Sequence, residues 1–373
     1  MEFITIEQRP RIQSCNVFIS TKNSTESREI KLSLKNNSIG LQIFNNLFDI
    51  DLQSLIVIPE SLSSLNVTDK WISFRLQSSP VDSTVGTFST EVIDSHKLER
   101  DNSIVTEIPE IQLPPKNTQL SLVCNCCKNI LTKSDIIFER VLPLPSDDCD
   151  PSQWFCCSHT GDDLNMKTLL QPRDKDFFYG SHYCILNRNI FLDKYKVFGE
   201  DVVCNRCLTV LGNCNLENFG NAVKFWNCSL QFTLKSSPSV YCNQTSPWID
   251  FKAAFLHCIN DDIFNSEINF LAAEQNRRYL LIIKPMEKNL SLLTESLTSK
   301  SNKITLDKKL VTKVLYRYEK SQCSVKNKNS DVRICRISVK SMIAGIDNLV
   351  LSSQRIPSIY RKIEPDYHVG YIL

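Results

Sequence analysis

Two Cys-x-x-Cys motifs constrain the fold of this chain of 373 residues more than any other feature of its sequence. The first opens the segment CNCCKNIL at Cys124, and the second opens CNRCLTVLG at Cys204. In each, the cysteines are followed closely by an apolar, strand-like run, and residues 128–203 separate the two pairs. Whatever these cysteines hold, it joins two distant parts of the chain.

The spacing of the cysteines predicts a metal site. Two residues between cysteines allow both thiolates of one tight turn to approach the same ion, and two such turns complete a tetrahedral site. We expect one structural zinc ion bound by Cys124, Cys127, Cys204 and Cys207, with Cys126 left over. Four thiolates close the coordination shell, so this ion is not expected to perform chemistry. Two alternatives stay open: buried cysteines without a metal, and a redox pair, although the βαβ context of thioredoxin-like proteins is absent.

Cysteine content and charge narrow the class of protein. The chain has 16 cysteines, and its first residues do not show the basic segment and apolar stretch of a signal peptide. We therefore expect reduced cysteines and a cytoplasmic or nuclear location. No apolar run approaches the roughly 20 residues that span a bilayer, and a net charge of +2 gives no sign of nucleic-acid binding. Membranes and nucleic acids are not expected partners.

The patterning predicts an α+β fold that is mostly β. Residues 1–118 contain runs of alternating apolar and polar residues, typical of strands, and form a predicted N-terminal β region. Residues 119–233 form a predicted zinc-binding β-domain with an inserted loop at 141–175, which is rich in Pro and Asp. Residues 234–373 form a predicted smaller α+β region.

Within the last region the expected elements alternate. Trp248, Phe251, Phe255 and Cys258 recur at helical spacing, with Pro247 near the first turn, which predicts an amphipathic helix. The sequence RRYLLIIKP predicts a buried strand, EKNLSLLTESL a helix, and KLVTKVLYRYE a further strand.

The cysteine-rich segment resembles the family of HECT-like, E2-binding ubiquitin-protein ligases. The motifs that carry the resemblance occur in the family's order: the first Cys-x-x-Cys, RVLPLPS, a Trp with a Cys-His pair, the aromatic segment DFFYGSHYCILN and the second Cys-x-x-Cys before Leu-Gly. The match is good over roughly residues 120–215 and weaker elsewhere. One departure is the sequence CCSH, where the family tends to place Cys next to His.

The resemblance implies an E3 ubiquitin-protein ligase that accepts ubiquitin from an E2 conjugating enzyme and passes it to protein substrates. A HECT-like mechanism implies a thioester on a ligase cysteine. The final cysteine is Cys335, beside Arg333 and Arg336, and residues 336–373 contain none. The alternative for Cys335 is core packing, because strand alternation places it with Ile337 in VRICRISV.

The resemblance also places an E2-binding segment near residues 234–258. The predicted helix with Trp248, Phe251 and Phe255 lies at the end of that segment. Its aromatic face could dock on an E2 enzyme, or it could pack against its own domain.

Members of this family are also linked to pre-mRNA 3′-end processing, where a Trp/Cys-His loop is thought to block a metallo-β-lactamase-type endonuclease by meeting its zinc. The matching residues are Trp154, Cys156, Cys157 and His159, with Cys157 the preferred ligand. A thiolate on an acidic loop could cap an open zinc position in a basic groove. Alternatively, Trp154 anchors the loop on its own core, or these cysteines, with Cys149 and His159, form a second metal site.

Three functions follow from these observations: ubiquitin ligase, inhibitory or chaperone-like binding protein of the endonuclease, and a β-domain that binds a small ligand or peptide beside its zinc. The five histidines do not form His-Glu-x-x-His, and phosphate-binding, dinucleotide and nucleophile-elbow motifs are absent. By resemblance, the ligase is the primary prediction and the endonuclease inhibitor the alternative.

Overall fold

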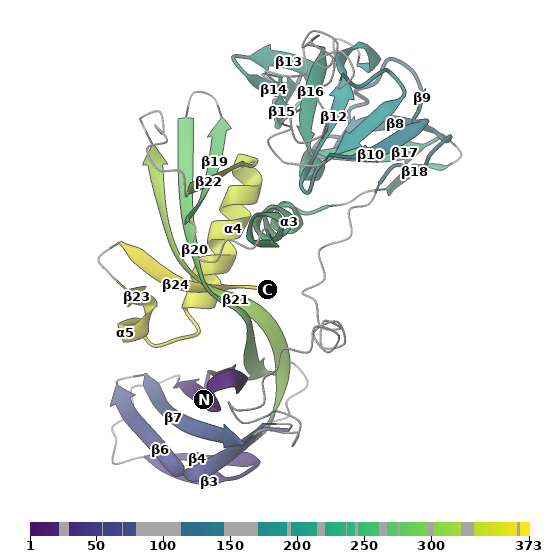
Figure 1. The fold of residues 1–373 in the computed structure, drawn as a ribbon. Helices are drawn as coiled ribbons and strands as arrows, with labels where there is room; N and C mark the ends of the chain where they lie inside the picture. The colour runs from purple at the N-terminus through teal and green to yellow at the C-terminus, as the bar shows by residue number, and fades with distance from the viewer. Residues whose placement is uncertain are drawn as a thin grey trace, which may run out of the picture. The chain divides into compact units, whose positions relative to one another are not determined.

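The computed structural model of the chain shows a protein built mainly of strands (Figure 1). It describes residues 1–21, 30–53, 55–68, 70–79, 113–144, 171–191, 195–214, 221–235, 237–242, 245–260, 267–274, 277–296, 302–321, 332–363 and 366–373. Against strands β1 to β24, this part of the chain has three α-helices: α3 (Pro247–Asn260), α4 (Val339–Ser353) and α5 (Ser358–Arg361). The expectation of a mostly β, α+β fold is confirmed.

The chain divides into two compact units that are not consecutive in sequence. Unit 1 comprises Met1–Glu107, Lys284–Arg317 and Asn348–Leu373, and unit 2 comprises Ile108–Ile283 and Tyr318–Asp347. This division differs from the three consecutive regions expected, because residues beyond 234 contribute to both units. Two strands of 19 residues, β20 (Arg277–Glu295) and β21 (Lys303–Ser321), run through both units.

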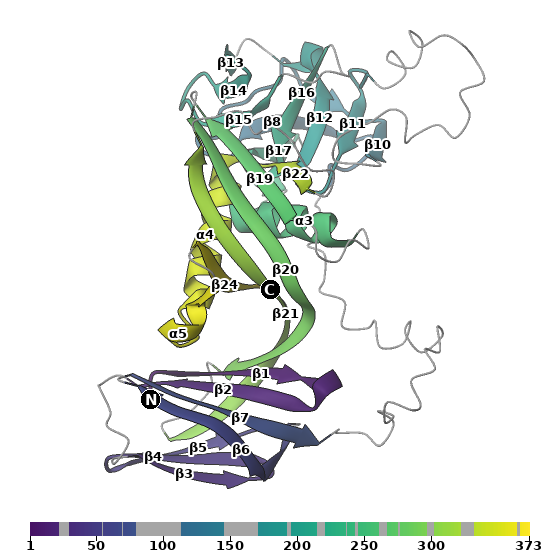
Figure 2. The same ribbon diagram turned by 60° about the vertical axis from the view of Figure 1, so that its left-hand side comes forward.

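Unit 1 is a curled sheet around an apolar core. Its strands follow the order β3-β4-β5-β21-β20-β1-β2-β7-β6. In Figure 2, β1 and β2 lie on one side of the unit, and β3, β4 and β5 lie on the other. The strands that the N-terminal segment contributes to unit 1 are β1 (Phe3–Arg9), β2 (Ser14–Ser20), β3 (Ile30–Lys35), β4 (Ser38–Ile43), β5 (Asn46–Asp51), β6 (Ile56–Thr68) and β7 (Trp71–Ser79).

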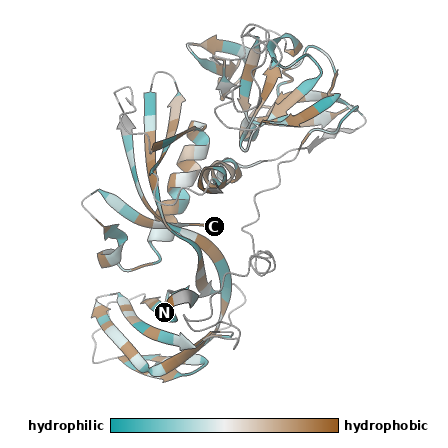
Figure 3. Ribbon diagram, viewed as in Figure 1, coloured by the Kyte–Doolittle hydropathy of each residue, from teal (hydrophilic) through white to brown (hydrophobic). Residues whose placement is uncertain are grey.

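Alternation along these strands produces the core. Ile4 and Ile6 of β1 are fully buried in a cluster with residues of β2, β4, β5 and β7, while Thr5 and Glu7 point to the other face. Figure 3 shows the corresponding alternation of apolar and polar segments along the strands. The strands expected around residues 30–79 are therefore present. The last strand, β24 (Tyr367–Ile372), pairs with β21, and its Tyr371 hydroxyl donates a hydrogen bond to Glu7.

Unit 2 contains two sheets that share one core. The larger sheet follows the order β10-β11-β12-β16-β15-β14-β13, and the smaller follows β18-β17-β8-β9. Phe177 of the larger sheet contacts Phe232 of the smaller, with ring centroids 5.8 Å apart. The strands of the two sheets are β8 (Gln119–Cys124), β9 (Ile136–Ile137), β10 (Arg140–Pro143), β11 (Asp176–Tyr179), β12 (Tyr183–Asn187), β13 (Tyr195–Phe198), β14 (Asp201–Cys204), β15 (Val210–Asn213), β16 (Ala222–Trp226), β17 (Leu230–Leu234) and β18 (Ser237–Cys242).

The helix α3 and the first part of α4, up to Asp347, belong to unit 2 with these sheets. The helix expected around Trp248 is α3, which begins after Ser246, whose Oγ accepts a hydrogen bond from the Ile249 N–H at 3.2 Å. The first part of α4 packs closely on it: a Cβ added at Gly345 would lie 2.5 Å from the Phe251 ring. β19 (Glu267–Glu274) and β22 (Val332–Arg336) pair in parallel beside them.

The prediction of a helix in EKNLSLLTESL is wrong. Residues up to Glu295 continue β20, and Ser291 to Thr294 pair with β1. Leu290 and Leu292 pack into one buried cluster, and Leu293 packs into another. Leucines on both faces of a paired strand bury more apolar surface than one helical stripe, so tertiary pairing overrides the local helix propensity.

A search of the described residues finds no helix long and apolar enough to cross a membrane.

Candidate metal centre

The two Cys-x-x-Cys motifs form matching turns. In the first, the Lys128 N–H donates to the Cys124 carbonyl at 2.8 Å, and in the second the Leu208 N–H donates to the Cys204 carbonyl at 2.9 Å. Lys128 and Leu208 both have positive φ angles, 58° and 60°, at the same position of each turn. This left-handed residue reverses the chain so that both thiols of each turn face the same side.

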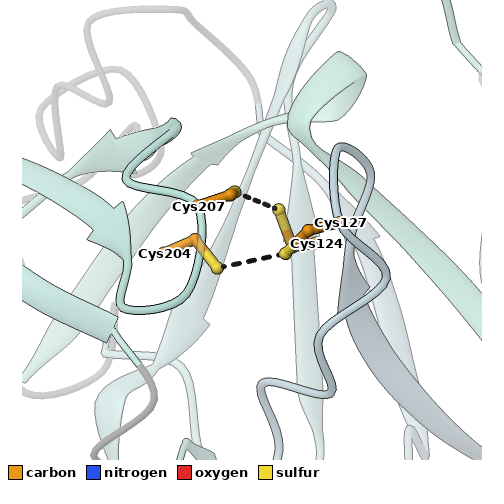
Figure 4. Close-up of side chains that lie close together, drawn as sticks. All are labelled: Cys124, Cys127, Cys204 and Cys207. Carbon is orange, nitrogen blue, oxygen red and sulfur yellow. Dashed lines mark hydrogen bonds between the residues drawn. The ribbon is translucent and has the colours of Figure 1, made fainter.

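The four cysteines predicted as ligands lie together (Figure 4). The Sγ atoms of Cys124 and Cys207 are 3.7 Å apart, those of Cys127 and Cys204 are 3.6 Å apart, and all four lie within 4.8 Å of one another. Metal–sulfur distances of about 2.3 Å place the sulfurs of a regular tetrahedron about 3.8 Å apart. The cluster therefore has the dimensions of a tetrahedral tetrathiolate site and could hold a metal ion.

The cluster joins the two sheets of unit 2. Cys124 is the last residue of β8, in the smaller sheet, and Cys204 is the last residue of β14, in the larger sheet. Both are fully buried, whereas Cys127 and Cys207 are partly buried. An ion at this position would cross-link strands that the sequence separates by the whole segment 128–203.

Hydrogen bonds to sulfur orient the thiols and affect their ionisation. Burial raises the pKa of the Cys124 thiol far above its ordinary value, although the N–H groups of Cys127 and Cys126 oppose this. Burial also acts on Cys207, but hydrogen bonds from the Thr209 side chain and backbone, and from neighbouring thiols, lower its pKa to about 6. Of these two thiols, Cys207 thus becomes a thiolate more readily, and metal binding would displace the remaining protons.

Residues beyond the cysteines support the site, and the sequence analysis did not identify them. The Asn129 side chain donates to Asn205 Oδ1 at 3.1 Å and lies 3.8 Å from Cys204 Sγ. The Asn125 side chain donates to the Cys228 carbonyl at 2.8 Å. A signal was available, because an Asn follows the first cysteine of both motifs. Within the described ranges, no other group of three or more His, Cys, Asp or Glu side chains has metal-binding geometry.

Those of the other predicted residues that the structure describes do not join the four cysteines. Cys335 lies on β22, opposite Phe270 of β19, and is 3% exposed. Phe251 and Phe255 of α3 are fully buried, and Trp248 is partly exposed and stacks on Phe251 at 5.8 Å. The predicted partner-binding loop lies outside the described residues, with Trp154, Cys156, Cys157 and His159.

The protein is thus mostly β, and a cluster of four cysteines that could hold a metal ion joins two of its sheets. The chain belongs to the family of HECT-like, ubiquitin-conjugating enzyme (E2)-binding proteins, whose family model matches residues 7–369. The family predicted from the cysteine-rich segment is thereby confirmed across nearly the whole chain.

One curated relative is an E3 ubiquitin-protein ligase of Rattus norvegicus, which is 30% identical over 92 residues. The similar stretch covers 25% of this chain and 24% of that protein, so the match spans about a quarter of the relative's length. No solved structure matches the chain.

Proposed function

We propose that this protein binds a ubiquitin-conjugating enzyme and acts as an E3 in the transfer of ubiquitin to protein substrates. The observation that carries this proposal is the family match over residues 7–369, which includes residues of both compact units. The name of the rat relative, an E3 ubiquitin-protein ligase, supports the same function, although its similarity covers a shorter stretch.

For the E2 contact we propose the exposed edge of α3. Phe251 and Phe255 are buried, and Phe251 contacts Phe270 of β19 with ring centroids 5.3 Å apart, so these side chains hold the helix in place. Trp248 lies in the first turn of α3 and is partly exposed. A large aromatic side chain that rests on a rigid support is the usual anchor of a protein interface.

Replacing Trp248 by Ala is expected to weaken binding of the cognate E2 by roughly tenfold or more, the usual cost of losing an aromatic anchor. Binding of the full chain to a panel of purified E2 enzymes by biolayer interferometry measures this. Phe198→Ala is the matched control, because Phe198 is an aromatic residue of unit 2 with 57% exposure on β13. If no E2 of the panel binds the wild-type chain, the proposed function fails; equal losses in both variants would reject only the role of Trp248.

The burial of Cys335 determines what we expect of the thioester step. A thiol can attack the E2–ubiquitin thioester only where the two sulfurs meet, and burial in apolar surroundings makes a cysteine inert. Among the described cysteines Cys126 is the exposed one. We therefore expect the folded protein to promote discharge of ubiquitin from the E2 without a thiol-sensitive ubiquitin adduct on Cys335.

A ubiquitin-charging assay under non-reducing conditions, with activating and conjugating enzymes supplied, checks this expectation. Cys335→Ser should retain wild-type discharge, and Cys126→Ser serves as the control for an accessible thiol. An adduct present in the wild type and in Cys126→Ser but lost in Cys335→Ser would contradict it and assign the nucleophile to Cys335.

We further propose that the tetracysteine centre binds one zinc ion with a structural role. Four thiolates and a tetrahedral arrangement are the ligand set of structural zinc sites, and no coordination position is left for a substrate. The endonuclease-blocking alternative involves the loop around Trp154 and stays a prediction, because that loop lies outside the described residues.

A further inference from the structure

A single buried turn lies between the tetracysteine centre and the helices of unit 2. This turn is the 3-10 helix η6 (Asn227–Ser229), which connects β16 to β17. Asn227 is 5% exposed, Cys228 is 4% exposed and Ser229 is 2% exposed. Its polar groups are therefore out of contact with water, and their hydrogen bonds within the protein fix its position.

On one side, η6 is hydrogen-bonded to the first cysteine turn and to the strand that follows the second turn. The backbone N–H of Asn125, in the first turn, donates to the Ser229 carbonyl at 2.9 Å, and its side chain donates to the Cys228 carbonyl at 2.8 Å. Ser229 Oγ donates to the carbonyl of Val210, which follows the second turn, at 3.2 Å. Asn125 stands directly after the ligand Cys124, so the position of η6 depends on the geometry of the metal centre.

On the other side, η6 is bonded to α3. The Cys228 N–H donates to the Asp250 carboxylate at 2.8 Å. Asp250 is 2% exposed and belongs to the first turn of α3. Burial raises the pKa of Asp250 to about 7, although the hydrogen bond from Cys228 opposes this. A buried carboxyl group tolerates few changes in its surroundings, so it needs η6 at a defined position.

The same turn meets the start of α4. Cys228 Sγ lies 3.7 Å from Ser338 Oγ and 3.7 Å from Ser341 Oγ. Ser338 begins the helix, because its Oγ accepts the Ser341 N–H at 2.9 Å. A second connection runs in parallel: the Asn227 N–H donates to the His182 carbonyl at 3.1 Å, and His182 Nε2 donates to the Arg336 carbonyl at 2.9 Å. Both helices thus begin at groups that η6 holds in place.

We propose that Asn125 and η6 couple the tetracysteine centre to the helix pair α3–α4, so that metal binding sets the position and the rigidity of the two helix N-termini. Loss of the metal releases the first cysteine turn, which removes the two hydrogen bonds of Asn125 to η6. The turn then no longer presents the Cys228 N–H and thiol to α3 and α4. In this arrangement the metal supports the helices from a distance, and Asn125 and Asp250 act as positioning residues whichever partner the protein binds.

Hydrogen exchange of the full chain, measured by mass spectrometry, tests the coupling with two arms. In the first arm, the wild-type protein is compared with and without a zinc chelator. We expect peptides covering the N-terminal turns of α3 and α4 to exchange faster together with the cysteine turns. Retained protection of both helices while the cysteine turns lose theirs would overturn the proposal.

The second arm keeps the metal and removes the side-chain hydrogen bond of Asn125 to η6. Asn125→Ala retains all four thiols and, at saturating zinc, should bind as much metal as the wild type. The N-termini of α3 and α4 should nonetheless exchange roughly fivefold to tenfold faster, the factor that corresponds to one lost hydrogen bond to a buried acceptor. Asn205→Ala is the matched control, because Asn205 is the equivalent residue of the second turn and accepts a hydrogen bond from Asn129 within the centre. Equal exchange of α3 and α4 in the two variants would reject the coupling, whatever the E2-binding measurements show.

Discussion

Replacing Cys204 by Ser is expected to abolish stoichiometric metal binding and to unfold the two-sheet part of unit 2. Metal binding by structural zinc sites contributes about 10–16 kcal/mol to folding, whereas a domain is stable by only about 5–15 kcal/mol. Cys204 is fully buried, and its Sγ lies 3.6 Å from that of Cys127. A serine hydroxyl is a poor ligand for zinc, so the three remaining cysteines leave the tetrathiolate coordination shell incomplete.

The measurement is the metal content of the purified protein by elemental analysis, followed by thermal unfolding with and without a chelator. Cys126→Ser is the matched control, because Cys126 lies in the first cysteine turn but is exposed and outside the cluster. It should bind one ion and unfold as the wild type does. A Cys204→Ser protein with unchanged metal content, or a chelated wild type with unchanged unfolding temperature, would contradict the structural role of the centre.

The metal centre could be predicted from the sequence because its information is local. Each Cys-x-x-Cys turn closes through backbone bonds between neighbours, such as Lys128 to Cys124, and two such turns supply the four thiolates of a tetrahedral metal site. The supporting residues were less visible. Asn125 has its role only because Cys228, far along the chain, presents a carbonyl to it, and no local pattern reports such a contact.

The helices, too, make contacts with distant parts of the chain that no local sequence pattern reveals. α3 was predicted from apolar residues at helical spacing, but its aromatic face could not be assigned to a partner or to the core by spacing alone. In the structure, Phe251 and Phe255 are fully buried. α4 was missed, although Ser338 provides an N-cap signal and Pro357 follows its end. Gly345, near the middle of α4, has a low helix propensity. The structure explains its presence, because the Phe251 ring lies so close that a Cβ at this position would collide with it.

Long-range strand pairing accounts for the difference between the expected regions and the observed units. β20 pairs with β1 through Ser291 to Thr294, and β21 pairs in parallel with β5 through Lys303 to Thr305. These partners lie more than 200 residues apart in sequence. Composition and the turn residues between neighbouring segments therefore do not indicate the pairing. What the sequence does show is the type of strand: RRYLLIIKP and KLVTKVLYRYE both predicted strands that are present.

The buried charge network of unit 1 follows from that pairing. Glu7 of β1 is 1% exposed, and its Oε1 accepts hydrogen bonds from Lys313 of β21 at 2.7 Å and from Tyr371 of β24 at 2.5 Å. Its Oε2 accepts from Arg9 at 3.1 Å and from Asn16 at 3.2 Å. Burial alone would raise the pKa of Glu7, but Lys313, Tyr371 and Arg9 outweigh it and lower the pKa below the ordinary value of 4.5. The carboxylate therefore links β1 to β21 and to β24.

Glu7→Gln is expected to destabilise unit 1 by about 3 kcal/mol at pH 7, because the partly buried Lys313 ammonium then loses its counter-ion. A carboxylate whose pKa is lowered in the folded state contributes stability above its unfolded pKa and loses it as the pH falls. The difference between wild type and variant should accordingly shrink below about pH 4.5. Urea unfolding followed by hydrogen exchange of peptides from β1 and β24 reports on unit 1 alone, so acid release of metal from unit 2 does not interfere.

Glu287→Gln is the control for this experiment. The Glu287 carboxylate is 35% exposed and pairs with Arg9 at 3.0 Å, and an ion pair with that much exposure contributes about 1 kcal/mol or less. Its loss removes a charge from the same network without leaving a buried ammonium behind. A Glu7→Gln variant no less stable than Glu287→Gln, or a difference that persists in acid, would show that packing rather than charge joins these strands.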